Sequence, residues 1–278
     1  MPLHQFILRN KISRLLPRRK PDTNKGDYGR LLIVAGSPGM TGAAVLASRG
    51  AMRSGVGYAI LSVPKSLVLL VDSMIPEVVT IPFEQIPKFK KKVNAIAIGP
   101  GIGVNRKAKK LISSLVARPT TLIIDADGIN NLGKNPKRLK KAKAKVILTP
   151  HPGEMSRLIG KRIKDIQKHR DAIALETAKK LGCIIVLKGH KTAVADPTGK
   201  LFVNPSGNPG MASAGVGDVL TGMIGGLAAQ GLSPWDAAVA GVFLHGCAGD
   251  LAAKEKGEYG MIASDLVEKV PYAISKNT

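Results

Sequence analysis

One stretch determines how the rest of the chain is interpreted, Asn204-Pro-Ser-Gly-Asn-Pro-Gly-Met-Ala-Ser-Ala-Gly-Val-Gly-Asp-Val-Leu-Thr-Gly222. Its glycines are crowded directly ahead of apolar residues at helical spacing, which are Val219, Leu220, Met223, Ile224 and Leu227. A glycine-rich loop that opens a helix leaves several backbone N–H groups unpaired, and the helix dipole adds partial positive charge there. The stretch therefore predicts an anion-binding loop at a helix N-terminus.

Asp218 falls in the first turn of this predicted helix. A carboxylate there can simply interact favourably with the helix dipole. Beside an anion-binding loop, it can instead be the base that takes a proton from a hydroxyl attacking a phosphate, and we favour this catalytic interpretation. Because the first N–H groups of the helix converge on Asp218, we expect its pKa to be held down and its carboxylate to stay ionised.

Patterns typical of buried strands alternate with helical patterns along most of the chain. We expect strands at 31–35, 58–63, 95–98, 121–125, 146–149 and 183–187. We expect helices at 43–53, 66–73, 168–181 and 237–253, and a hairpin at 193–203. This alternation predicts an α/β fold in which a mostly parallel central sheet has helices on its faces.

Loops with glycine, carboxylate or histidine residues follow three of these strands. They are Gly99-Pro-Gly-Ile-Gly103, Ala126-Asp127-Gly128 and Pro150-His-Pro-Gly-Glu154. In open α/β sheets, ligands bind outside the carboxyl ends of the strands. We therefore expect the three loops to meet at one edge of the sheet and to form a single site.

Several other kinds of site are not indicated. The sequence has no Cys/His cluster with zinc spacing, no Gly-x-Ser-x-Gly elbow and no Walker A lysine pattern. Gly99 to Gly103 lacks the full spacing of a dinucleotide-binding loop. His245 lies inside a helical pattern, where a lone histidine is more often a hydrogen-bonded core residue than a catalyst. Phosphate chemistry therefore depends on the loop at 215–218.

The composition is strongly basic, with 42 Lys and Arg residues against 19 Asp and Glu in a chain of 278, a net charge of +23. The lysines are scattered in short runs and aromatic residues make up only 4%, which leaves little on which bases could stack. We interpret this charge as solvated helix faces and expect no specific nucleic-acid site.

We expect a single domain over residues 1–278, with a basic N-terminal surface arm of about 1–25 rather than a targeting peptide. No apolar run reaches the length of about 18 residues that a membrane span needs, so no membrane association is expected. The only two cysteines, Cys183 and Cys247, favour a reducing compartment, and we expect the protein in the cytoplasm.

Gly-x-Gly-Asp opening a late helix resembles the anion hole and catalytic aspartate of ribokinase-like kinases, which have a three-layer α/β/α fold. Within that fold the chain resembles the nucleotide-dependent NAD(P)H-hydrate dehydratases over about residues 15 to 275. The matching motifs are Lys25-Gly-Asp-Tyr-Gly-Arg30, Gly36-Ser, Gly99-Pro-Gly-Ile-Gly103, Asp125-Ala-Asp127, Thr149-Pro-His-Pro-Gly-Glu154, Leu187-Lys-Gly189 and Gly207-Asn-Pro-Gly-Met211.

The resemblance implies a repair reaction in which the hydroxyl of hydrated NADH or NADPH is phosphorylated and phosphate then leaves. It implies ADP as co-substrate in the bacterial type, Mg²⁺, a homotetramer and functional pairing with a separate epimerase. Residues implied to contact the hydrated dinucleotide are Ala43, Gly103, His151 and Asp218, with Asp218 as the catalytic base. Residues implied to hold the nucleotide are Lys188, Gly189, His190, Lys191, Thr192, Gly215 and Gly217. Glu154 is implied to organise Mg²⁺ through water.

Two positions depart from the family pattern. The loop is usually Gly-Gly-Thr-Gly-Asp, whereas this chain has Ala214-Gly-Val-Gly-Asp218. Val216 removes a hydroxyl, but the backbone N–H groups remain, so we still expect activity. The alternative is a small-molecule kinase of the same fold, such as a hydroxymethylpyrimidine or hydroxyethylthiazole kinase, which would release a stable phosphorylated product.

Overall fold

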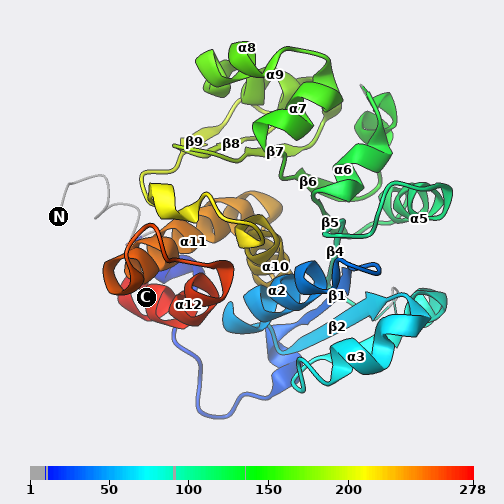
Figure 1. Cartoon of the computed structure of the whole chain (residues 1–278), viewed down its shortest axis with the longest axis vertical. Coiled ribbons are helices and arrows are strands. Elements are labelled where there is room, and N and C mark those ends of the chain that lie inside the picture. Colours follow the sequence, from blue (N-terminus) through cyan, green and yellow to red (C-terminus); the bar gives the residue numbers. More distant parts are fainter. Residues whose placement is uncertain (1–9, 11, 90–91, 135) are drawn as a thin grey trace.

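The computed structural model describes residues 10, 12–89, 92–134 and 136–278. Its centre is one nine-stranded sheet, shown with its helices in Figure 1. The strand order is β3 (Val79–Pro82), β2 (Tyr58–Val63), β1 (Arg30–Val34), β4 (Ala95–Ile98), β5 (Thr121–Ile124), β6 (Lys145–Leu148), β7 (Ile184–Leu187), β8 (Ala193–Ala195) and β9 (Leu201–Val203). The strands from β3 to β7 pair in parallel, and β8 and β9 add an antiparallel hairpin. The predicted mostly parallel sheet and the predicted hairpin are confirmed.

Helices cover both faces of the sheet. One apolar cluster includes buried residues of α2 (Thr41–Arg53), α3 (Val68–Asp72), α10 (Val216–Ala229), α11 (Pro234–Lys256) and α12 (Ala263–Asn277). The opposite cluster includes residues of α4 (Ile86–Phe89), α5 (Arg106–Val116), α6 (Asp127–Leu132), α7 (Pro152–Ile159), α8 (Ile163–Lys168) and α9 (Arg170–Leu181). Successive side chains of a strand point to opposite faces, so the residues of each central strand alternate between the two clusters. Ile33 belongs to the first cluster and Leu32 to the second. The protein therefore has the expected three layers.

Small residues set the position of α10, the helix that follows the glycine-rich stretch. A Cβ atom on Gly222 would lie 1.8 Å from the backbone oxygen of Ala47, and one on Gly50 would lie 2.4 Å from that of Val219. Only glycine fits this close crossing of α2 and α10. The crossing places the start of α10 at the carboxyl edge of the sheet.

The sequence analysis missed several elements, including the helices from α4 to α8, the strand β3 and the helix α12. β3 is a four-residue edge strand that ends in Pro82, and a proline weakens any strand pattern although edge strands tolerate it. α12 contains Pro271 inside the helix, which interrupts the helical pattern. The helix expected at 66–73 is instead a 3-10 turn over Lys65–Leu67 followed by the short α3.

The predicted N-terminal arm falls partly outside the described residues, which omit 1–9 and 11. In its described part Ile12 is fully buried in the apolar cluster that includes residues of α10, α11 and α12. The guanidinium of Arg19 lies 3.7 Å from the centre of the Tyr28 ring and donates a hydrogen bond to the Gly55 oxygen. This part of the arm is therefore packed against the body of the protein.

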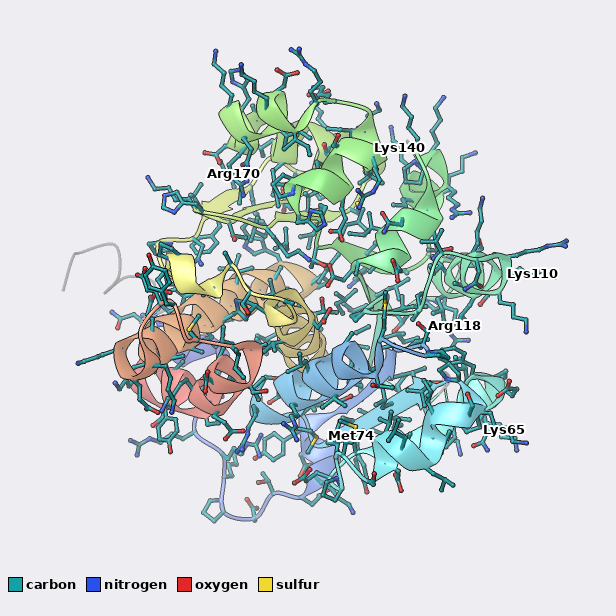
Figure 2. The ribbon with its side chains drawn as sticks, viewed as in Figure 1. Lys65, Met74, Lys110, Arg118, Lys140 and Arg170 are labelled. Carbon is teal, nitrogen blue, oxygen red and sulfur yellow. The ribbon has the colours of Figure 1, made fainter. Side chains whose placement is uncertain are left out.

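Basic side chains are dispersed over the surface. Figure 2 shows Lys65, Lys110 and Lys140 extending outward from separate elements. Of the helices in the described ranges, none combines the length and the apolar character required to cross a bilayer.

Candidate active site

The glycine-rich loop opens α10 as the sequence predicts. Gly215 caps the helix with a φ of +85°, and a Cβ atom there would lie 2.4 Å from Leu46 Cδ1. Within the part of the chain that the structure describes, no side chain caps α10. Its first N–H groups are therefore available to a ligand, with Asp218 in the first turn.

His245 supports this loop from beneath. Its Nε2 atom lies 2.9 Å from the Val216 oxygen, and burial lowers the pKa of His245 to about 4. The imidazole is therefore neutral, and its Nε2–H donates to the Val216 carbonyl. The interpretation of His245 as a hydrogen-bonded core residue is confirmed.

Three polar side chains meet where β5, β6 and β7 end. Lys188 follows β7, and its Nζ atom lies 2.6 Å from Oδ1 of Asp125, which follows β5. The same amine lies 4.0 Å from Oε2 of Glu154, at the start of α7 after β6. The second oxygen of Asp125 accepts a hydrogen bond of 2.7 Å from the hydroxyl of Thr221 on α10. The expected convergence of the strand-end loops is thus observed, with a buried ion pair at its centre.

His151 and Glu154 cap the start of α7 together. The Gly153 N–H donates to Nδ1 of His151 at 3.0 Å, and the His151 N–H donates to Oε2 of Glu154 at 2.8 Å. Burial and the nearby Lys188 lower the pKa of His151, so its neutral form is favoured. The structure therefore gives His151 a capping role in addition to the expected substrate contact.

The electrostatics of Asp218 differ from the prediction. Burial, followed by the charge of Asp125, raises its pKa to about 7 despite the opposing charge of Lys188. Glu154 and Asp127 raise it further. The expected low pKa was wrong, because burial and three neighbouring carboxylates outweigh the helix N–H groups. The proton affinity of Asp218 is therefore unusually high for an aspartate.

Gly103 and Ala43 lie on the neighbouring part of the same edge. The Gly103 N–H donates to Oδ2 of Asp127 at 2.9 Å, and the Asn131 side chain donates to the Gly103 oxygen at 2.9 Å. A Cβ atom on Gly101 of this loop would lie 3.2 Å from the Cβ of Ala43. Ala43, in α2, therefore lies beside the loop that contains Gly103.

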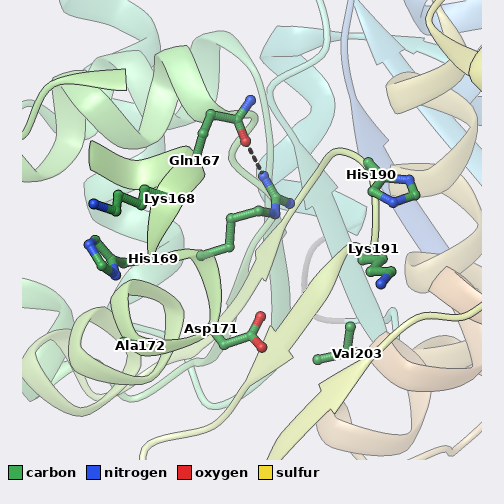
Figure 3. A pocket seen from close by; sticks show the side chains of 9 residues that line it. Gln167, Lys168, His169, Asp171, Ala172, His190, Lys191 and Val203 are labelled. Carbon is green, nitrogen blue, oxygen red and sulfur yellow. Dashed lines mark hydrogen bonds between the residues drawn. The ribbon is translucent and has the colours of Figure 1, made fainter. Parts of the chain in front are cut away.

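The predicted nucleotide segment 188–192 is divided in two. Lys188 turns inward to Asp125, whereas His190 and Lys191 line a separate cavity of about 400 Å³ (Figure 3). The opposite wall includes Arg170, whose guanidinium donates to Gln167 Oε1 at 2.8 Å and to the Leu187 oxygen at 2.7 Å. This cavity is lined by Gln167, Lys168, His169, Arg170, Asp171, Ala172, His190, Lys191 and Val203. Lys188 and the exposed end of the segment therefore face different surroundings.

The residues at the site fit a magnesium ion that the protein contacts through water. Glu154 is 5% exposed and its oxygens already have His151 as a partner, at 2.8 Å from the backbone nitrogen and 3.3 Å from Nε2. In the described ranges, no three His, Cys, Asp or Glu side chains are arranged to hold an ion directly. Mg²⁺ commonly keeps several waters and binds substrate phosphates, which agrees with an indirect role for Glu154.

Asp125 and Asp127 were quoted from the sequence as part of a matching motif but were given no role of their own, and Thr221 was not singled out. Thr221 lies one turn after Gly217 on the helix, and its partner Asp125 is distant in sequence. Only the fold brings that pair together.

Known proteins resemble the whole chain. A family model described as NAD(P)H-hydrate dehydratase matches residues 31–272. The ADP-dependent (S)-NAD(P)H-hydrate dehydratase of Neisseria meningitidis serogroup B is 37% identical over 254 residues, 89% of this chain and 86% of that protein. The bifunctional NAD(P)H-hydrate repair enzyme Nnr of Moorella thermoacetica is 40% identical over 93% of this chain. The match is 52% of that protein, so this chain spans about half the length of the bifunctional relatives.

Solved structures agree with these matches. The ADP/ATP-dependent NAD(P)H-hydrate dehydratase of Bacillus subtilis, co-crystallised with ATP and Mg²⁺, gives a TM-score of 0.88 at 34% identity and covers 97% of both chains. A hydroxyethylthiazole kinase of Pyrococcus horikoshii gives a TM-score of 0.61 at 12% identity, a likeness of fold alone. A ribokinase-like superfamily protein of Enterococcus faecalis V583 gives a TM-score of 0.84 at 27% identity over 97% of this chain, which confirms the ribokinase-like fold. The chain belongs to the NAD(P)H-hydrate dehydratase family.

Proposed function

We propose that this protein dehydrates the S-epimer of hydrated NADH and NADPH back to the reduced dinucleotides, with ADP as phosphoryl donor. The observation that carries the proposal is Asp218 beside the uncapped start of α10, in a cluster that also holds Lys188. A base next to an anion-binding loop is the arrangement that phosphorylation of a hydroxyl requires. Family membership specifies which hydroxyl this is.

The reaction needs two steps, because hydroxide is a poor leaving group and phosphate is a good one. In the first step Asp218 accepts the proton of the ring hydroxyl as its oxygen attacks the β-phosphorus of ADP, and AMP leaves. The N–H groups of the 215–217 loop stabilise the charge on the phosphoryl oxygens. In the second step the lone pair of the ring nitrogen expels phosphate as the C–O bond breaks, and loss of a ring proton restores the double bond. This second step is chemistry of the substrate itself.

The raised pKa of Asp218 suits this role. A general base works best when its pKa lies near the working pH, and the pKa of Asp218 is raised to about 7. Bound Mg²⁺ would supply neutralisation of the phosphate charge, with Glu154 contacting it through water. The remaining carried-over contacts are proposed as the resemblance implies: Ala43, Gly103 and His151 toward the dinucleotide, and residues 189–192 toward the nucleotide.

The protein's wider setting is also proposed from its relatives. Bifunctional relatives carry repair activity in a chain about twice as long, which supports functional pairing with an epimerase. We further propose a homotetramer and a cytoplasmic location. Sedimentation velocity at several concentrations tests the assembly, and a stable monomer would contradict it.

Absorbance at 340 nm tests the function directly, since reduced nicotinamide absorbs there and its hydrate does not. The purified protein should restore this absorbance from the S-hydrate with Mg²⁺ and ADP, and the initial rate with ATP at equal concentration should be lower. Reactions without nucleotide are the control. A rate that is clearly higher with ATP would overturn the choice of donor. Phosphorylation of a pyrimidine or thiazole alcohol without any change at 340 nm would instead support the kinase alternative.

A further inference from the structure

The Lys188 amine lies between an acidic partner and the anion-binding loop. Its Nζ atom is 2.6 Å from Asp125 Oδ1, and a Cβ atom built on Gly217 would lie only 3.2 Å from the same nitrogen. The side chain of Lys188 is 17% exposed and that of Asp125 is 1% exposed. The ammonium group is therefore held close to Gly217, in the first turn of α10.

Asp125 connects three elements of the fold. Its two oxygens accept from Lys188, after β7, and from Thr221, on α10, while the residue itself follows β5. Thr221 is fully buried and lies four residues after Gly217, so its hydroxyl is one helical turn below the loop. This linkage fixes the position of the carboxylate and, through it, the position of the amine.

A contribution to folding stability alone does not explain the buried ion pair between Lys188 and Asp125. Transferring two charges from water into the protein is costly, and buried pairs are often no more stabilising than apolar side chains of the same size. Burial lowers the pKa of Lys188, but Asp125 and Glu154 outweigh it and keep the pKa above its usual value. The amine therefore stays charged, beside a loop whose N–H groups attract anions.

We propose that Lys188 contacts the transferring phosphoryl group, and that Asp125 and Thr221 are positioning residues that hold its amine at the Gly217 loop. This rests on the proposed function and differs from the expectation that Lys188 acts together with residues 189–192 in holding the nucleotide. Charge spreads over the equatorial oxygens of a phosphoryl group as it transfers, so a fixed cation there acts mainly in the transition state. Carboxylates surround the site, and Lys188 is the cation that opposes them at Asp218.

The test separates kcat from KM. Removing one preorganised donor to a transition-state oxyanion typically lowers kcat by about 10²–10³. We expect that loss in Lys188→Gln, with a much smaller change in the KM for ADP, and a smaller loss of kcat in Asp125→Asn. Thr221→Val should lower kcat in the same way, and Thr221→Ser should restore most of it because the hydroxyl returns. Lys161→Gln is the matched control, since the Lys161 side chain forms an exposed pair with Glu176 at 2.8 Å, and its replacement should leave both constants unchanged.

The outcomes distinguish the two proposals. If the unmodified protein restores no absorbance at 340 nm with either nucleotide, the proposed function fails and the role of Lys188 fails with it. If the unmodified protein is active but Lys188→Gln raises only the KM for ADP, the function stands and Lys188 is a ground-state nucleotide contact, which overturns the inference. Thermal melting accompanies each variant. If Asp125→Asn does not fold, the two Thr221 variants test the positioning role instead. Equal activities of Thr221→Val and Thr221→Ser would reject that role.

Discussion

Two helices, α7 and α10, begin at the same edge of the sheet, but their N-termini are capped differently. At α7 the side chain of His151 accepts from the Gly153 N–H, and Glu154 accepts from the N–H of His151, so the helix start is satisfied internally. At α10 the cap is Gly215, and no side chain of the described residues bonds to the first turn. One helix start is closed by its own residues and the other is open to a ligand.

The difference shows what a helix N-terminus needs before it can bind phosphate. Both helices have an acid in the first turn and both have a macrodipole. What distinguishes α10 is glycine at the cap, which contributes no side-chain oxygen or nitrogen to compete with a ligand. The proposed anion site therefore lies at the helix start that no side chain of the described residues caps, with Asp218 in its first turn.

Asp218→Asn should have the largest effect on this contrast. The amide keeps the shape of the side chain but cannot accept the proton, and removing a positioned base lowers the rate by about 10²–10⁴. Nucleotide affinity should be retained or rise slightly, because repulsion with the phosphates is relieved. The 340 nm assay measures the rate, and calorimetric titration with ADP measures the affinity.

Asp265→Asn is the matched control for this variant. Asp265 is also a first-turn acid, at the start of α12, where its Oδ2 accepts from the Ile262 N–H at 2.9 Å. Its replacement should leave the rate unchanged. Near-native activity of a folded Asp218→Asn would remove Asp218 as the base and make the two helix starts equivalent.

The dependence on pH provides a second test of Asp218. Because its pKa is raised to about 7, kcat/KM of the free enzyme should fall about tenfold per pH unit below that value as the base becomes protonated. The free energy of unfolding should change in the opposite direction, so that it decreases as the pH rises. The neutral carboxyl favours the fold fully below its unfolded pKa of about 3.9, and this contribution is lost as pH rises to about 7.

Melting curves at pH 5 and pH 8 would show this second effect. The melting temperature of Asp218→Asn minus that of the unmodified protein should be larger at pH 8 than at pH 5. The reason is that asparagine has no charge to bury at pH 8. A kcat/KM that stays constant from pH 5 to pH 8 would show that the pKa of the base is not raised, which would agree with the lowered pKa predicted from the sequence.

Local patterns predicted the elements around the site, and contacts between distant residues determined its chemistry. The glycine spacing before Val219 is sufficient to predict an open helix start, because it depends on a few neighbouring residues. The pKa of Asp218 was predicted in the wrong direction, because the fold buries this carboxylate and brings Asp125 and Glu154 near it from segments that follow other strands. A sequence motif does not reveal how many like charges the fold will place beside it.

Lys188 illustrates the same limit. In the sequence it belongs to the run Lys188-Gly-His-Lys-Thr192, which suggests one shared role. In the structure the backbone of this run has φ of +138° at Gly189 and +54° at Lys191, so successive side chains diverge. Lys188 then pairs with Asp125 while His190 and Lys191 face the cavity of Figure 3.

The smallest of these effects concerns the closed helix start, where His151 has two roles to separate. His151→Ala removes the cap of α7, which costs about 1 kcal/mol of stability, and it also removes the proposed contact with the dinucleotide. His151→Asn restores a good capping residue without the imidazole. We therefore expect lower melting temperatures only for alanine, and a raised KM for the hydrate with a smaller change in kcat for both variants. If asparagine restores the KM as well as the melting temperature, capping is the whole role of His151. The N-terminus of α7 would then have only a structural role, whereas the N-terminus of α10 would bind the ligand.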